Sequence, residues 1–180
     1  MGTRSQIIVQ CRDGKVRSIY CHWDGYLSHN GDILQKHYNS QAMAEALVAL
    51  GDLSSLGEEI GEKHDFNYGL KLPVDSPECR RLRRMCNVYH RDRGESWADV
   101  KPEVFDNTPA AWPDPETWAE FAYVWNLERQ CWFVAGAHEG TQALVPLAYA
   151  LAHPDSIDAN VIVPFVGIVG KHQAKPKLSA

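Results

Sequence analysis

Two short runs of β-branched and apolar residues open the chain. They span residues 4–11 and 16–22, and the second carries Val, Ile and Tyr at alternating positions. Residues 12–15, Arg-Asp-Gly-Lys, stand between them. An Asp-Gly pair between strand-like runs favours a hairpin turn, because glycine supplies a positive φ at no steric cost. The pattern therefore predicts an N-terminal β-hairpin.

Helical spacing follows a polar loop that is rich in turn-forming residues. A first helix is expected from about Ile33 to Tyr38. A second helix begins near an N-cap at Asn39 or Ser40 and ends at Gly51. Its apolar face is predicted to consist of Met43, Ala46, Leu47 and Leu50.

The next part of the chain contains one segment with a weak secondary-structure pattern and two with a clearer one. Glycines and prolines interrupt residues 52–78, which predicts an irregular, partly extended excursion. Residues 86–90 predict a third strand. Residues 121–134 predict a second, aromatic hairpin, in which Trp125 and Trp132 form a cross-strand pair.

The C-terminal third adds one helix and one more strand. Pro146 suits the first turn of a helix over residues 147–152. Residues 161–169 are apolar and β-branched, and predict a buried or edge strand. Three prolines make residues 108–115 a stiff connection.

These elements predict a single α+β domain over residues 1–170, followed by a flexible tail over residues 171–180. The expected architecture is a mixed or antiparallel sheet of hairpins with several helices packed on it. The length of 180 residues is sufficient for a substantial core, and 44% hydrophobic with 23% charged residues is typical of a folded protein.

Charge and cysteine content narrow the setting. The formal net charge of -5 gives no global positive field to attract nucleic acid. Five cysteines without a C-x-x-C pair favour reduced thiols and a cytoplasmic location. No apolar run is long enough to cross a bilayer, so we expect no membrane partner.

One basic cluster could still contact nucleic acid locally. The alternative is a solvated face that pairs with the acidic stretch of Asp52, Glu58, Glu59, Glu62 and Asp65. The candidate nucleic-acid contacts are Arg80, Arg81, Arg83 and Arg84, and Arg91 and Arg93 extend the cluster.

The densest polar and aromatic stretch follows the first hairpin. A cysteine nucleophile at Cys21 is one interpretation, but adjacent strand residues point to opposite faces, so His22 is not its expected base. The second interpretation is a metal site, although no recognisable metal motif supports it. Its ligands would be His22, Asp24, His29 and His90 or Asp92. The third interpretation is structural: aromatic rings anchor the loop while polar side chains cap turns.

A binding surface is the interpretation we favour. The loop after the first hairpin and the turn over residues 89–95 are expected to pack together, so that aromatic rings and arginine side chains form one site. We assign no catalytic residue, no metal and no cofactor. The predicted binding residues are His22, Trp23, Asp24, Tyr26, His29, His90, Arg91 and Arg93.

Four segments of the chain together resemble a family of small, uncharacterised proteins carried by bacteriophages and prophages. These are Met1-Gly2-Thr3-Arg4-Ser5, Tyr20-Cys21-His22-Trp23-Asp24-Gly25-Tyr26, the stretch Leu50 to Gly57, and Tyr89-His90-Arg91-Asp92-Arg93-Gly94-Glu95. The resemblance covers roughly the first 100 residues. It implies a genomic setting in a phage and a protein acting in the host bacterial cytoplasm, and it supplies no catalytic residues.

Two function hypotheses follow. The first is a phage accessory protein that acts by binding, in counter-defence: it inhibits a host defence protein or sequesters a small nucleotide signal, without turnover. The second is a small metal- or Cys-dependent hydrolase acting on a nucleotide or amide. Formation of a homo-oligomer is a further hypothesis.

Overall fold

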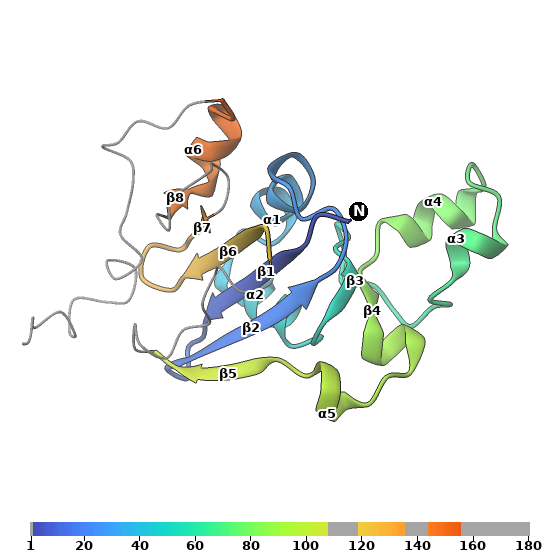
Figure 1. Cartoon of the computed structure of the whole chain (residues 1–180), viewed down its shortest axis with the longest axis horizontal. Helices are drawn as coiled ribbons and strands as arrows, with labels where there is room; N and C mark the ends of the chain where they lie inside the picture. Colours follow the sequence, from blue (N-terminus) through green and yellow to red (C-terminus); the bar gives the residue numbers. More distant parts are fainter. Residues whose placement is uncertain (1, 108–118, 136–143, 156–180) are drawn as a thin grey trace, which may run out of the picture.

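The computed structural model describes residues 2–107, 119–135 and 144–155. Within these residues the chain forms one α+β domain, built on an eight-stranded mixed sheet with helices packed against it (Figure 1). The predicted fold class is confirmed. The predicted stiff connection over residues 108–115, the predicted strand over residues 161–169 and the predicted tail over residues 171–180 lie outside the described residues.

Two antiparallel hairpins form the centre of the sheet. The first joins β1 (Ser5–Gln10) to β2 (Lys15–Cys21), and the second joins β6 (Phe121–Asn126) to β7 (Cys131–Ala135). Strands β1 and β6 lie side by side and run parallel. Both predicted hairpins are confirmed.

The predicted tryptophan pair is also confirmed. Trp125 lies opposite Trp132 in the register of the second hairpin, and their ring centroids are 5.4 Å apart in an edge-on arrangement. Both rings are buried. Their indole N–H groups donate to Gln41 Oε1 at 2.6 Å and to the carbonyl oxygen of Tyr38 at 3.1 Å, so neither polar group is left unsatisfied in the core.

Short strands complete the sheet on both sides. The order is β4-β3-β2-β1-β6-β7-β8, and β5 pairs with β2. These outer strands are β3 (Leu53–Ser55), β4 (Asn87–Val88), β5 (Glu103–Asp106) and β8 (Val145–Pro146). The predicted third strand is therefore shorter than expected, because the chain turns at Tyr89 into a π-helical turn, η2 (Tyr89–Arg93).

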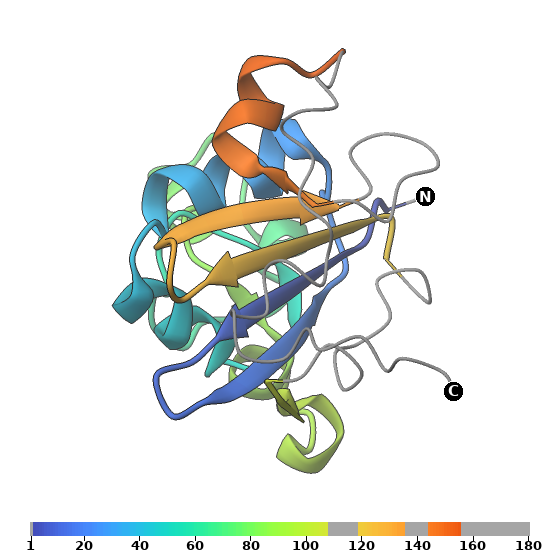
Figure 2. The same ribbon diagram turned by 90° about the vertical axis from the view of Figure 1, so that its left-hand side faces the viewer.

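Helices cover one face of the sheet. These are α1 (Asp32–His37), α2 (Gln41–Val48) and α6 (Leu147–Ala152), and Figure 2 shows α1 and α2 against the sheet. Their apolar residues form the larger core cluster with alternate residues of the central strands. A smaller cluster lies on the opposite face, around Ile8, Val16, Val124, Phe133 and Leu144.

Helix α2 has the predicted start but ends at Val48, before Gly51, and it has a different buried face. Ser40 Oγ accepts a hydrogen bond from the Met43 N–H at 3.3 Å, as expected of an N-cap. The placement of Met43 in the core is wrong, because this residue is exposed. Gln41 is buried instead, since its amide accepts from the Trp125 indole and donates to the carbonyl of Gln10 at 2.8 Å.

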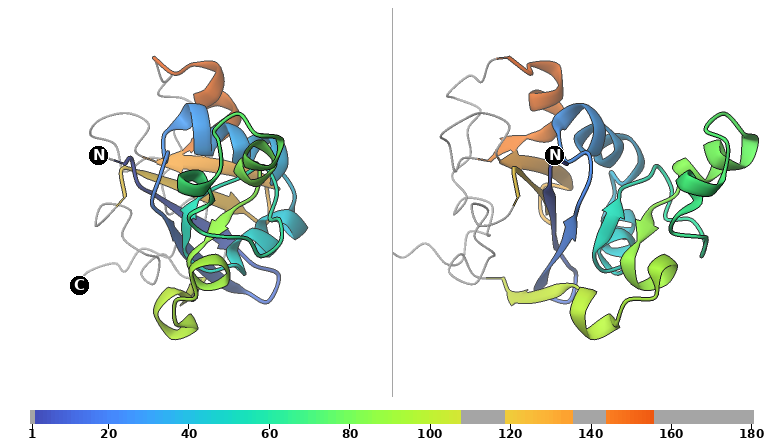
Figure 3. Two further views of the ribbon diagram at one scale, coloured as in Figure 1. Left: turned by 90° about the vertical axis from the view of Figure 1, so that its right-hand side faces the viewer. Right: turned by 45° about the vertical axis from the view of Figure 1, so that its right-hand side comes forward.

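The remaining helical segments are short and lie around the sheet. Helices α3 (Tyr68–Lys71) and α4 (Pro77–Arg83) lie at the β4 end of the molecule (Figure 3), and α5 (Trp97–Val100) precedes β5. Helix α4 falls at the end of the predicted irregular excursion; Ser76 caps it by accepting from the Cys79 N–H at 3.1 Å. A π-helical turn, η1 (Leu27–Gly31), leads into α1.

Candidate functional site

The two stretches predicted to form a binding surface leave neighbouring parts of one sheet. Residues 22–30 follow β2, residues 89–93 follow β4, and β3 lies between these two strands. The Trp23 N–H donates to the carbonyl of Ser54 in β3 at 3.0 Å, and the Tyr89 N–H donates to the carbonyl of Asp52, just before β3, at 3.2 Å. The first part of one stretch is thus linked to the start of the other.

Asp52, just before β3, links β2 to the start of η2. Its carboxylate accepts the backbone N–H of Tyr20 at 2.8 Å, and its carbonyl accepts the backbone N–H of Tyr89 at 3.2 Å. Burial raises the pKa of Asp52 to about 6, and the charges of Glu103 and Glu95 act in the same direction. The Asp52 carboxyl group therefore contacts the backbone of Tyr20, and its carbonyl contacts the backbone of Tyr89.

The half of the site that β2 supplies is a chain of three rings. The Tyr20 hydroxyl is 2.9 Å from His22 Nδ1, and the His22 ring meets the Trp23 ring edge-on with centroids 4.6 Å apart. Tyr20 and His22 are half-buried, whereas 45% of Trp23 is exposed. The indole thus forms an exposed end of this chain.

The other half is a stack capped by a cation. Phe66 and Tyr89 stack with ring centroids 5.6 Å apart, and the Arg93 guanidinium lies 5.3 Å from the Phe66 centroid and 5.8 Å from that of Tyr89. Arg93 also forms an exposed ion pair with Glu95 at 3.1 Å. We call the whole set the aromatic surface: Tyr20, His22, Trp23, Phe66, Tyr89 and Arg93.

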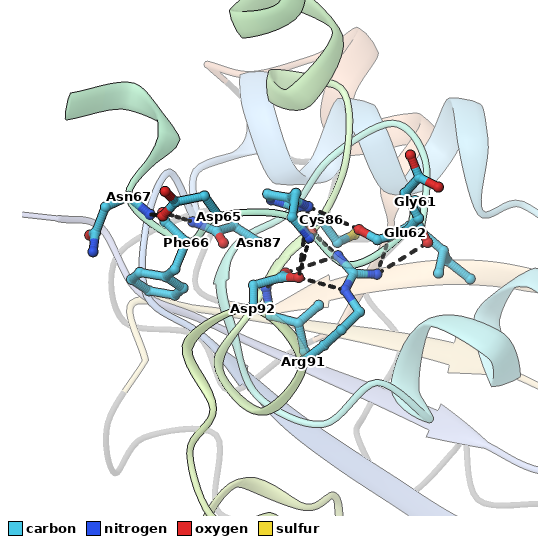
Figure 4. A network of polar contacts seen from close by, with 12 residues as sticks. Gly61, Glu62, Asp65, Phe66, Asn67, Cys86, Asn87, Arg91 and Asp92 are labelled. Atoms are coloured by element: carbon cyan, nitrogen blue, oxygen red, sulfur yellow. Dashed lines mark hydrogen bonds and ion pairs between the residues drawn. The ribbon is translucent and has the colours of Figure 1, made fainter. Parts of the chain in front are cut away.

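Arg91 supports this surface from within. Its guanidinium donates to the carbonyl oxygens of Ile60, Gly61 and Cys86 at 2.8, 3.2 and 2.6 Å, and to both oxygens of Asp92 (Figure 4). These five hydrogen bonds use all five N–H groups of an arginine. Arg91 therefore fixes η2 to the loop before α3, and its donors are occupied by the protein itself.

Asp92 is the centre of the same network. Its carboxylate accepts backbone N–H groups of Val88 at 2.7 Å and His64 at 3.2 Å, besides the two hydrogen bonds from Arg91. Its side chain is fully buried. Four hydrogen bonds, two of them from the bidentate Arg91 cation, compensate the cost of burying the charge. The loop that carries Phe66 and the turn that carries Arg93 are thus held in one arrangement.

Three of the predicted site residues lie apart from the aromatic surface. Tyr26 and His29 meet edge-on at 5.9 Å on η1, which packs against α1 and α6. His90 points away from Tyr89: its Nδ1 is 2.7 Å from the carbonyl of Glu95, and its ring contacts Trp97 at 5.2 Å. Of the predicted site, the structure puts His22 in contact with Trp23, while Arg93 lies on the Phe66–Tyr89 stack, and the backbones of the two sets are linked through the segment Asp52 to Ser54.

Asp24 shapes the loop after β2. It adopts φ 57°, an uncommon value for a residue other than glycine, and its carbonyl accepts the N–H of Asn30 at 3.3 Å. Its position is that of a turn residue between the exposed Trp23 and η1.

Cys21 is enclosed beneath the same loop. It is fully buried, and its thiol contacts the carbonyl of Trp23 at 3.7 Å and the side-chain amide of Asn30 at 3.4 Å. Burial raises the pKa of this thiol to about 12. A thiol that stays protonated and closed to solvent does not supply a nucleophilic thiolate near neutral pH.

Metal chemistry has no assembled ligand set in this region. Among residues 2–107, 119–135 and 144–155, no three histidine, cysteine or acidic side chains converge in a way that could hold a metal ion. His22 and His29 instead contact Tyr20 and Asn30, with Nδ1 of His29 3.0 Å from Asn30 Oδ1.

The basic cluster lies largely on α4 and faces the acidic stretch. Arg81 pairs with Glu62 at 3.2 Å, and Arg84 pairs with Glu58 at 3.0 Å and Glu59 at 2.8 Å. For these two arginines the predicted pairing is confirmed. The exposed pairs reduce the local positive charge that a nucleic acid would meet.

A cavity of about 620 Å³ lies on another part of the molecule, between the first hairpin turn, α2 and the α5–β5 segment. Four of its charged residues, Arg12, Asp13, Arg17 and Glu45, are engaged with one another. Arg17 pairs with both oxygens of Asp13 at 3.0 and 2.5 Å, and Glu45 accepts the Arg12 N–H at 2.7 Å. Burial raises the pKa of the Cys11 thiol in its wall.

Sequence reasoning missed three members of the aromatic surface. Tyr20 and Tyr89 sit at or beside strand positions, where an aromatic residue is more often part of a core. Phe66 lies in the irregular excursion, where no periodicity indicates which way a side chain points. The arrangement of the three depends on β3 and on the Arg91–Asp92 network, neither of which has a local sequence signal.

Comparison with protein families, with curated proteins and with solved structures finds no match for this chain. The described helices include none with the length and apolar character needed to span a membrane.

Proposed function

We propose that this chain is a binding protein whose aromatic surface takes a protein partner. On this proposal it is a counter-defence protein of a bacteriophage or prophage, and the partner is a host defence protein that it inhibits. The observation that carries the proposal is the stack of Phe66 and Tyr89 beneath the Arg93 guanidinium, together with a Trp23 side chain that is 45% exposed and whose backbone is hydrogen-bonded to Ser54 of β3.

The residue types of this surface suit a protein interface. Tryptophan, tyrosine and arginine are enriched among the residues that contribute most binding energy in such interfaces. A large exposed ring costs little conformational entropy to immobilise, because it has only two side-chain torsions. Trp23 and Arg93 are the exposed anchors, and Tyr20, His22 and Tyr89 are half-buried supports.

Rigidity of the supporting layer also favours binding. The turn that carries Arg93 is fixed by a buried ion pair, and the hydrogen bond from the Tyr89 N–H to the Asp52 carbonyl holds Tyr89 beside β3. A preorganised surface loses less entropy when a partner binds. The setting in a phage rests on the sequence resemblance described above, which covers Tyr20 to Tyr26 and Tyr89 to Glu95.

The hydrolase hypothesis finds less support in this region. Its cysteine form requires a reactive thiolate at Cys21, which is buried and has a raised pKa. Its metal form requires convergent ligands, and His22 and His29 are turned toward Tyr20 and Asn30. Binding without turnover is the function that the described geometry supports best.

A phage plating assay tests the proposal. The chain is expressed in host strains that each carry one defence system, and the plating efficiency of a phage sensitive to that system is measured. We expect the wild-type protein to restore plating on at least one strain. The double variant Trp23→Ala, Arg93→Ala should lose this effect.

The matched control is Tyr26→Ala, which removes an exposed ring outside the aromatic surface. It should protect the phage as the wild type does, and circular dichroism should show that all variants are folded. The proposal fails if the wild-type protein protects on none of the strains, or if the double variant protects as well as the wild type.

A further inference from the structure

Another cavity is lined in part by His64, whose backbone N–H donates to Asp92 of the Arg91–Asp92 network at 3.2 Å. It has a volume of about 320 Å³ and is bounded by the loop before α3, by α3 and by α4. His64, Tyr68 and Leu82 form part of its wall. Lys63, Lys71 and Arg81 contribute cationic side chains, and Asp65 and Glu78 contribute carboxylates.

His64 is the unusual residue of this cavity. Only 4% of its side chain is exposed, and its Nδ1 is 3.0 Å from the carbonyl oxygen of Glu62. A carbonyl only accepts hydrogen bonds, so Nδ1 carries a proton, and it also lies 3.7 Å from Oδ1 of Asp92. In the neutral form of the ring Nε2 is then an acceptor. Nε2 is buried and has no hydrogen-bond partner among the described residues.

A buried acceptor without a partner is unfavourable, because it has lost its hydrogen bonds to water and gained none in return. The two nitrogens flank Cε1 of the imidazole ring and their hydrogen-bonding directions diverge widely, so Nε2 does not point at the Glu62 carbonyl that Nδ1 meets. The Tyr68 ring contacts the His64 ring edge-on, with centroids 5.6 Å apart. A ligand that enters beside the Tyr68 ring, with a small shift of that ring, would reach this nitrogen and remove the cost.

The cations of the cavity indicate the charge of such a ligand. Lys71 pairs with Asp65 and Arg81 pairs with Glu62, and the four side chains of these pairs are between 44% and 74% exposed. Exposed pairs are weak, so a multiply charged anion can replace the carboxylates. Lys63 forms no ion pair with another residue that the structure describes.

We infer that this cavity is a binding site for a nucleoside monophosphate. The base presents an N–H donor to His64 Nε2 and lies against the Tyr68 ring, while the phosphate meets Lys63, Lys71 and Arg81. This site is separate from the aromatic surface and goes beyond the proposed function. The two are connected through the backbone, because the His64 N–H donates to Asp92 at 3.2 Å.

Isothermal titration calorimetry with AMP, GMP, CMP and UMP, each tested alone, examines the site. We expect saturable binding of at least one nucleotide that weakens as salt is added. His64→Phe keeps a buried aromatic ring but removes Nε2, and should weaken binding by about tenfold, the value of one hydrogen bond to a buried acceptor. His37→Phe, at an exposed position of α1, is the matched control and should bind as the wild type does.

Nitrogen NMR of the wild-type protein provides a second measurement that does not depend on a folded variant. With the nucleotide bound, the Nε2 resonance of His64 should shift as this atom accepts a hydrogen bond, and its Nδ1 resonance should stay that of a protonated nitrogen. The inference is overturned if none of the four nucleotides binds, if His64→Phe binds as tightly as the wild type, or if the Nε2 resonance is unchanged at saturation. Phage plating measures the aromatic surface without added nucleotide, so the two proposals fail independently.

Discussion

Arg91 and Asp92 are adjacent in the sequence and form a bidentate ion pair with each other. The distances are 2.8 Å from Nε to Oδ1 and 2.9 Å from Nη2 to Oδ2. Neighbouring side chains normally diverge in a helix or strand. Here the tight η2 turn and three carbonyl acceptors fold the arginine side chain back over its neighbour.

Removal of the Asp92 carboxylate should destabilise the protein strongly. Asp92→Ala leaves the Arg91 guanidinium inside the protein without its counter-charge, and leaves two backbone N–H groups without an acceptor. We expect a loss of about 3–5 kcal/mol in the free energy of unfolding, measured by urea denaturation. Glu95→Ala, which breaks the exposed pair with Arg93, should cost less than about 1 kcal/mol. Equal effects of the two substitutions would show that the network is not a structural centre.

Gly14 and Gly51 provide a matched pair of substitutions. Both have positive φ, 78° and 77°, but a Cβ at Gly14 would meet no atom within 4 Å, whereas one at Gly51 would lie 2.4 Å from the carbonyl oxygen of Val100. Gly14→Ala should therefore cost about 1–2 kcal/mol, the cost of the left-handed backbone alone. Gly51→Ala should cost at least about 1 kcal/mol more because of the clash. Thermal unfolding of both variants measures the difference, and a Gly51→Ala midpoint at or above that of Gly14→Ala would contradict it.

Asp52 should give the protein a stability that falls as the pH rises. The folded protein holds this proton up to a pKa of about 6, while the unfolded chain releases it near 3.8. Between these values the folded state binds more protons, so stability decreases from about pH 4 to pH 6 and then levels off. Asp52→Asn keeps an acceptor for the Tyr20 N–H and should remove this trend.

Urea denaturation at pH 4 and pH 7 compares the two proteins. The variant should gain roughly 1–2 kcal/mol on the wild type over this interval, after allowance for the partial exposure of Asp52. A wild-type protein and variant with parallel pH profiles would mean that burial of Asp52 does not perturb its ionisation.

The cysteines should differ in their reactivity toward a thiol reagent such as DTNB. Burial raises the pKa values of Cys21, Cys86 and Cys131, but Cys21 and Cys86 are buried, whereas Cys131 is half-buried and open to a reagent. In the native protein we expect Cys131 to react first and Cys21 to react only when the protein unfolds. Cys131→Ser should remove the fast phase. Rapid labelling of Cys21 in the folded protein, identified by mass spectrometry, would restore the cysteine hydrolase hypothesis.

The fold was predictable where the chain carries a local signal. Both hairpins, the N-cap at Ser40 and the helix after Pro146 follow from turn residues, capping and alternation. The buried face of α2 was not, because the position of Gln41 depends on the distant Trp125 indole, which needs an acceptor. Tertiary contacts decide such cases against local apolar spacing.

The site was predictable only in part, for the same reason. Trp23 and Arg93 were identified from their setting in polar and aromatic stretches. Phe66 and Tyr89 acquire their role because β3 and the Asp92 network bring three separate segments together. The sequence also placed Arg91 among the ligand contacts; its five hydrogen bonds within the protein could be found only from the fold.

The parallel pairing of β1 with β6 determines when this domain can be completed during synthesis. β1 leaves the ribosome early, yet its partner on one side begins only at Phe121. Until that point the nascent chain holds a hydrophobic strand, Ile7 to Val9, with one edge open. A chaperone that shields this edge, or slow translation that prolongs its exposure, should therefore change the yield of folded protein more than any change in the short outer strands.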